Sequence, residues 1–208
     1  MNKLTIQQEL SAFYRRVGFG EVVGKRPMTV PVYTGCLLVP LPNIEARSKY
    51  LKYHDIHHLM TSYSVGRIGE GEVSAWELGT GSFFSSPLLG TMNLIALSTG
   101  LFLEPCRMWK AFVLGCQSKN VYGANTRQTI DNDEWKNIDE LRSSFVGIKP
   151  NVQPGLVRSL EFFIYSAVSM VIHAAIALPA LFVRIGTDLI LKKDFIQAIK
   201  PLKRSDLF

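Results

Sequence analysis

The chain contains few of the residues that cross-link secreted proteins or build clusters of several metal ions. Its three cysteines, Cys36, Cys106 and Cys116, are odd in number and form no CxxC pair. A disulfide framework is therefore not expected, and a reducing compartment is favoured. Four of the 208 residues are histidines, and none of them precedes His54. Any site that uses histidine must therefore be built from a small number of ligands.

The N-terminal segment lacks the apolar core of a secretory signal peptide. Residues 1–21, MNKLTIQQELSAFYRRVGFGE, carry charge throughout, and the acid Glu9 is atypical of a transit peptide. The spacing of Leu10, Phe13 and Val17 instead predicts a short amphipathic helix.

The charge balance is basic, with a net charge of +6 from 23 lysines and arginines against 17 acids. Such a balance suits nucleic acid or an anionic membrane surface. The sequence has no basic run with interleaved aromatic residues, which is the pattern of single-strand binders. Basic residues instead flank apolar segments, so we expect a membrane partner and no nucleic acid.

Glycine and proline divide the first half of the chain into predicted loops and helices. Residues 18–43 are rich in glycine, proline and β-branched residues, which favours a loop with extended pieces. A helix then starts at Asn43, a candidate N-cap, and runs to about Tyr63. Gly66 and Gly69 predict a turn over VGRIGE, with a positive φ at one of the two glycines.

Further helices are predicted in the second half of the chain. One begins near Glu70 with EVSAWEL, and RMWKAFVLGCQSKN forms another. PLLGTMNLIALSTGLFLEP is long enough to cross a membrane, but its glycines and Pro105 favour a buried core helix. A helix over DNDEWKNIDELRSSF is expected to begin at Asp131 or Asn132, and a linker, GIKPNVQPG, follows it.

The C-terminal part of the chain contains a long uncharged run. Residues 162–183, FFIYSAVSMVIHAAIALPALFV, form 22 uncharged residues between Arg158 and Arg184. At about 1.5 Å per residue, the run is long enough to cross a hydrocarbon core of roughly 30 Å. The alternative is a buried helix kinked at Pro179. The basic stretch that follows favours a membrane-associating tail over residues 155–208, with a dipping or re-entrant course.

Three of the four histidines lie in one pentapeptide, HDIHH. On a helix, His54, Asp55 and His58 fall within an arc of about 100°, so their side chains can converge on one ion. Glu70 follows 16 residues after His54, and the glycine turn lets a second helix bring it to the same ion. Two imidazoles and two carboxylates suit Zn²⁺, Fe²⁺ or Mn²⁺ better than Ca²⁺. A solvated polar helix face is the alternative reading, and the clustering favours a metal site.

Four other kinds of site share parts of this pattern. HDIHH fits the HExxH motif of zinc proteases with Asp55 in place of glutamate, although glutamate is strongly preferred there. It also fits the HxxHH box of membrane di-iron enzymes, but those use many more histidines and only His173 remains here. HD phosphohydrolases use a further histidine upstream, which this sequence lacks. A purely structural metal is the fourth alternative.

The motif as a whole resembles that of one known family. His54, Asp55, His58 and Glu70 match the HDxxHx11E motif of the Coq4 family of ubiquinone biosynthesis proteins. The segments YSVGRIGEGEVSAWELG and DNDEWKNIDELRSSFVGI are also similar to that family. The resemblance covers roughly residues 5–149, and the tail is not part of the family's pattern.

The resemblance implies an all-α, Coq4-like helical domain over residues 1–149, followed by the apolar helical tail. The metal ligands would be His54, Asp55, His58 and Glu70, while the residue between them at position 57 is variable in the motif. The expected cofactor is one divalent metal ion, zinc in first place, with iron, manganese or magnesium as alternatives. The implied activity is a metal-dependent decarboxylation with hydroxylation at ring carbon 1 of a prenylated hydroxybenzoate.

The same resemblance implies membrane lipid, an isoprenoid-tailed quinone precursor and other quinone-biosynthesis enzymes as partners. We expect a homo-oligomer on the cytoplasmic face of a bacterial inner membrane, or on the matrix face of the mitochondrial one. PLLGTMNLIALSTGLFL and the tail would form the apolar slot for the isoprenoid chain, and Arg67 would pair with the substrate carboxylate. The alternative function is a non-catalytic, metal-stabilised lipid-binding scaffold that organises the biosynthetic enzymes, with Arg67 a solvated loop residue.

Overall fold

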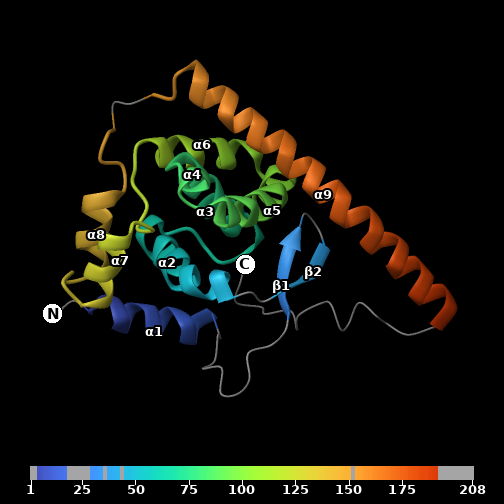
Figure 1. The fold of residues 1–208 in the computed structure, drawn as a ribbon, viewed down its shortest axis with the longest axis horizontal. Helices are drawn as coiled ribbons and strands as arrows, with labels where there is room; N and C mark the ends of the chain where they lie inside the picture. Colours follow the sequence, from blue (N-terminus) through green and yellow to red (C-terminus); the bar gives the residue numbers. More distant parts are fainter. Residues whose placement is uncertain (1–3, 18–28, 35–36, 43–44, 151–152, 192–208) are drawn as a thin grey trace.

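The computed structural model describes residues 4–17, 29–34, 37–42, 45–150 and 153–191, and most of them are helical (Figure 1). Strands β1 (Thr29–Thr34) and β2 (Leu37–Pro42) pair in antiparallel fashion. The predicted all-α class is confirmed, with this hairpin as its one addition within the described ranges. The helices are α1 (Ile6–Val17), α2 (Glu45–Thr61), α3 (Arg67–Gly79), α4 (Ser82–Ser85), α5 (Pro87–Leu103), α6 (Pro105–Cys116), α7 (Ala124–Asp131), α8 (Ile138–Phe145) and α9 (Leu156–Leu191).

Capping residues explain where two of these helices begin. The Ser86 hydroxyl accepts a hydrogen bond from the Leu89 N–H, and a proline occupies the first position of α5. At α8, the Asn137 side chain accepts from the Glu140 N–H at 3.0 Å. The Glu140 carboxylate accepts in turn from the Lys136 N–H at 2.7 Å, which makes a reciprocal cap.

The expectation of a helix starting at Asp131 or Asn132 is wrong. Asp131 is the last residue of α7, and Asn132 caps the C-terminal end of that helix. The backbone at Asp133 then adopts a positive φ of 55°, which a continuing helix does not allow. The next helix therefore starts only after Asn137. The other candidate cap, Asn43, lies outside the described residues.

Helix α3 lies at the centre of the helical body, where glycines let its neighbours approach closely. A Cβ on Gly79 would collide with the Phe112 carbonyl oxygen of α6. On the α5 side, a Cβ on Gly71 would lie 2.8 Å from the Cα of Gly100. Larger side chains would push these helices apart. The contacts therefore fix the position of α3 and of Glu70 in its first turn.

The buried apolar side chains form two clusters. The first includes Phe13 of α1, Ile56 of α2 and Leu141 of α8, whereas the second joins residues of α3, α5, α6 and α9 around Trp76 and Phe112. Figure 1 shows α1, α7 and α8 away from α9, with α3, α5 and α6 between them. The contact between α2 and α3 is therefore one of the places where the two clusters meet.

The two apolar segments of the sequence have different surroundings. Helix α5 buries most of its apolar residues, which confirms the prediction of a core helix there. Helix α9, with 36 residues, packs on α5 and α6 along one side of the body (Figure 1). Its segment Leu156–Pro179 is long and apolar enough to span a membrane. Helix α9 continues through Pro179 to Leu191, so the chain does not reverse direction at this proline. The dipping or re-entrant course in a membrane stays a prediction.

Candidate metal centre

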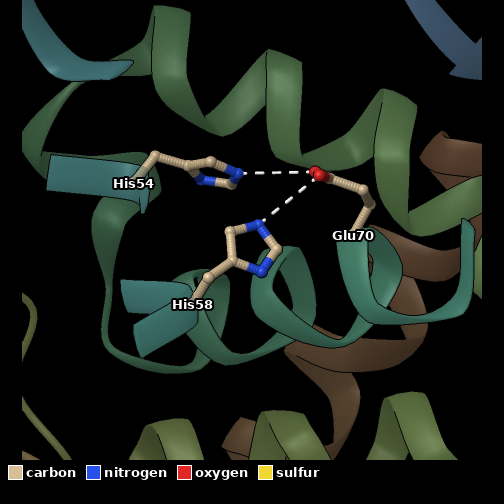
Figure 2. A group of neighbouring side chains, drawn as sticks. All are labelled: His54, His58 and Glu70. Atoms are coloured by element: carbon tan, nitrogen blue, oxygen red, sulfur yellow. Dashed lines mark hydrogen bonds and ion pairs between the residues drawn. The ribbon is translucent and has the colours of Figure 1, made fainter. Parts of the chain in front are cut away.

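Helices α2 and α3 bring three of the four predicted ligands together. His54 and His58 are one turn apart on α2, and Glu70 lies in the first turn of α3 (Figure 2). The Nε2 atoms of His54 and His58 lie 3.4 and 3.5 Å from the two carboxylate oxygens of Glu70. One ligand atom from each residue lies within 4.8 Å of the other two. We call these three residues the triad.

Hydrogen bonds on the far side of each imidazole orient the two Nε2 atoms. His54 Nδ1 lies 2.9 Å from Glu77 Oε1, and His58 Nδ1 lies 3.1 Å from the carbonyl oxygen of Tyr63. Both partners are acceptors, so in the neutral rings each Nδ1 carries the proton and donates it. Each Nε2 then presents a lone pair towards Glu70, as in histidines that bind metals.

The triad fits a divalent metal ion. His58 Nε2 is buried and has no hydrogen-bond partner among the described residues. A cation would satisfy this lone pair, the one on His54 and the negative charge of Glu70 together. Two imidazoles and a carboxylate suit Zn²⁺, Fe²⁺ or Mn²⁺. The Glu70 side chain is 33% exposed, so the site is in contact with solvent.

The same contacts set the charges of the site. Burial by itself would raise the pKa of Glu70, but His58 and His54 outweigh burial and hold this pKa far below its usual range. Burial lowers the pKa of His54, yet the Glu77 and Glu70 carboxylates outweigh burial and raise it well above its usual value. A proton and a metal ion therefore compete for His54, so metal binding releases a proton.

Asp55, the fourth predicted ligand, lies beside the triad rather than within it. Its Oδ2 accepts a hydrogen bond of 2.9 Å from the hydroxyl of Tyr14 on α1. Burial raises the pKa of Asp55, and the nearby His54 and His58 act against this rise. The carboxylate therefore lies in the field of the site, and its role as a ligand stays a prediction.

Arg67, the predicted partner of a substrate carboxylate, is the first residue of α3, one turn before Glu70. Its side chain is partly exposed. Arg67 is therefore close to Glu70 along the chain, and its role in binding substrate stays a prediction.

Glu77 on α3 is a residue of the site that the sequence reasoning missed. Its fully buried Oε1 accepts hydrogen bonds from the Nδ1 atoms of His54 and His57, at 2.9 and 2.7 Å, and from the Tyr122 hydroxyl at 2.8 Å. Its Oε2 accepts from the Asn93 amide at 2.8 Å. Burial would raise the pKa of Glu77, but the histidines outweigh burial and hold it far below its usual range. The carboxylate is therefore charged and holds His54 in place.

His57 belongs to this buried network and not to the triad. Its Nδ1 contacts Glu77, and its Nε2 accepts a hydrogen bond of 3.0 Å from the Val121 N–H. Because both ring nitrogens are engaged, His57 has no lone pair left for a metal.

A sequence signal for Glu77 existed in its spacing of seven residues from Glu70, since two helical turns return to the same face.

Gly69 positions Glu70 through a close contact and not through a positive φ, so that prediction is wrong. Gly66 is the N-cap of α3 with a φ of −76°, and Gly69 lies inside the helix without a positive φ. A Cβ on Gly69 would collide with the carbonyl oxygen of Ser64 in the preceding turn. The turn therefore ends at Gly66. Because Gly69 has no side chain, the start of α3 can lie against the Ser64 carbonyl of that turn.

No family model, curated protein or solved structure matches this chain.

Replacing His54, His58 or Glu70 with alanine should lower zinc affinity by more than about a hundredfold. Loss of a direct ligand exceeds the 10–100-fold effect of losing an outer partner. Competition with a chelator and elemental analysis of the purified variants measure this effect. His173→Ala is the control and should keep its metal, because His173 is the one histidine outside the cluster and lies on α9. Full metal content in His58→Ala would contradict the proposed site.

Asp55→Asn tests the fourth ligand separately. The amide oxygen still accepts the Tyr14 hydrogen bond, so the contact between α1 and α2 is kept while the negative charge is lost. A loss of zinc affinity as large as that of Glu70→Ala would make Asp55 a ligand. An unchanged affinity would restrict it to orienting α1.

Gly69→Ala should weaken zinc binding although it changes no ligand. The new Cβ must displace the Ser64 carbonyl or the start of α3, and either movement shifts Glu70. Isothermal titration with zinc, together with circular dichroism of the metal-free protein, measures both effects. Gly123→Ala is the matched control, because its Cβ would meet nothing closer than 3.7 Å. Equal zinc affinity in both variants would show that Glu70 is positioned in another way.

Glu77→Gln should lower zinc affinity by about 10- to 100-fold, because His54 loses the carboxylate that orients its ring. It should also destabilise the fold by about 1–3 kcal/mol, since buried donors lose an acceptor. Glu72→Gln is the control, because Glu72 is a second buried carboxylate on α3 that pairs with Arg107 and contacts no member of the triad. Equal zinc affinities in the two variants would show that Glu77 does not contribute to metal binding.

Proposed function

We propose that this protein is a membrane-associated, metal-dependent protein of isoprenoid quinone biosynthesis, similar in role to the Coq4 family. The observation that supports this most is the triad, whose residues occupy the positions of the HDxxHx11E motif and fit a divalent ion. The proposed substrate is a prenylated hydroxybenzoate. The proposed net reaction exchanges the carboxyl group at ring carbon 1 for a hydroxyl group and releases CO₂. It is a two-electron oxidation with O₂ as the oxidant, at one O₂ for every two substrate molecules.

The proposal gives each residue of the site a separate task. A bound divalent metal would supply Lewis acidity towards the carboxylate or phenol oxygen of the ring. Glu77 and the Tyr63 carbonyl keep the two imidazoles in the tautomer that binds metal. Arg67, at the start of α3, would pair with the substrate carboxylate and orient the ring.

The apolar helices suit the isoprenoid part of such a substrate. Helix α5 packs on α3, which carries Glu70, and on α9. An isoprenoid chain gains about 0.8 kcal/mol for each CH₂ group that it buries. We therefore assign the head group to the triad and the chain to α5 and α9. The length and composition of α9 support membrane association.

The second candidate is a non-catalytic scaffold that binds lipid and whose metal holds the fold. It is favoured by the position of the site, because α2 belongs to one core cluster and α3 to the other. A metal between them would tie the two clusters together and raise the stability of the folded state.

The two candidates differ in turnover. We expect the purified protein, loaded with Fe²⁺, Mn²⁺ or Zn²⁺, to release labelled CO₂ from a prenylated hydroxybenzoate in the presence of oxygen. Glu70→Ala should abolish this release, because it removes a ligand, while His173→Ala should retain it. A protein that melts at a higher temperature with metal but releases no CO₂ with any of the three ions would be the scaffold.

A further inference from the structure

Helix α9 turns apolar residues outward and polar residues towards the helical body. Between Leu156 and Pro179, every exposed residue has an apolar side chain. These residues repeat at intervals of three and four and form one continuous face, which we call the outer stripe. Phe163 and Val171 in this stripe are 75% and 68% exposed.

The polar residues of the same segment are all buried or partly buried. Arg158 donates a hydrogen bond to the Gly79 carbonyl at the end of α3. Three turns further on, the Ser169 hydroxyl donates to the Leu94 carbonyl of α5 at 2.6 Å. The inner face of α9 is thus attached to the body by polar contacts as well as by apolar packing.

This polarity is the reverse of that of a helix on the surface of a water-soluble protein. A contiguous apolar surface of this extent marks contact with a membrane or with another protein. Protein interfaces carry a polar rim, whereas the outer stripe contains no polar side chain. The sequence after Arg184 adds Lys192, Lys193 and Lys200, which suit anionic lipid headgroups. A lipid bilayer therefore fits the stripe better than a second protein.

The contacts along α9 also decide between crossing the bilayer and lying along it. They extend from Arg158 to His173, whose ring lies 4.8 Å from that of Phe102 on α5. This length is about 22 Å of helix, most of a hydrocarbon core of roughly 30 Å. If α9 crossed, α6 would enter the hydrocarbon with its exposed Arg107 and Lys110, where charge is costly. A helix lying flat immerses the outer stripe alone.

We propose that α9 is an in-plane membrane anchor whose outer stripe lies in the bilayer interface, with the helical body on the aqueous side. This proposal deepens the membrane association of the proposed function and rests on that association, but not on the metal chemistry. The partner is a bilayer that contains anionic lipid. Because α3 and α5 lie between α2 and α9 (Figure 1), these helices separate the metal centre from the lipid, and we expect a lipid substrate to reach it along α5.

Flotation with vesicles of equimolar phosphatidylcholine and phosphatidylglycerol tests the anchor on the full-length protein. Phe163→Glu and Val171→Glu should each weaken vesicle binding by about tenfold or more, because each removes apolar burial and adds a charge. Leu4→Glu is the control, since Leu4 is a 50% exposed apolar residue beside α1, away from α9. It should bind as the wild type does. Zinc content should be unchanged in all three variants, so a failure of the metal centre would not affect this result.

Depth measurements distinguish the in-plane helix from a crossing one. A fluorescent label is attached to single cysteines that replace Val157, Val168 or Leu178, in a chain whose native cysteines are changed to serine. Spin-labelled lipids should quench all three labels at the same shallow depth. A deep label at Val168 between two shallow ones would overturn the proposal in favour of a span. The proposal would also be overturned if Phe163→Glu floated with the vesicles as well as the wild type does. The same holds if the wild-type protein formed a dimer without vesicles and Phe163→Glu dissociated it.

Discussion

The buried carboxylate of Glu77 is the interaction on which the arrangement of α2 and α3 depends. It accepts hydrogen bonds from His54 and His57 on α2, from Asn93 on α5 and from Tyr122 in the segment after α6. A buried charge that lacks such donors would be strongly destabilising. The folded state therefore requires these separate elements to meet in one register. The same requirement turns the Nε2 atom of His54 towards Glu70.

The three clustered histidines have different roles because of this carboxylate. His57 has both ring nitrogens in hydrogen bonds and ties α2 to Glu77 and to the backbone at Val121. His54 and His58 each use Nδ1 for the protein and keep Nε2 for the triad. The pentapeptide thus combines one residue that holds the fold with two that face the candidate metal centre.

The candidate metal centre and the outer stripe of α9 lie on opposite sides of one helical layer. Helices α5 and α6 pack on α3 towards the site and on α9 towards the outer stripe (Figure 1). The glycine contacts at Gly71 and Gly79 hold α3 close to this layer.

Features that depend on local spacing were determined by the sequence itself. They include the helical class, the core helix α5, the apolar length of α9 and the pairing of His54 with His58, because the helical period alone places them one turn apart. The tertiary structure decided the hydrogen bond between Asp55 and Tyr14, the buried role of Glu77 and the outward polarity of α9. These features require contacts between segments far apart in the chain, and residue type and spacing do not specify which segments meet. The positions of the α2–α3 turn and of the α7–α8 break were likewise set by backbone contacts that residue preference alone does not fix.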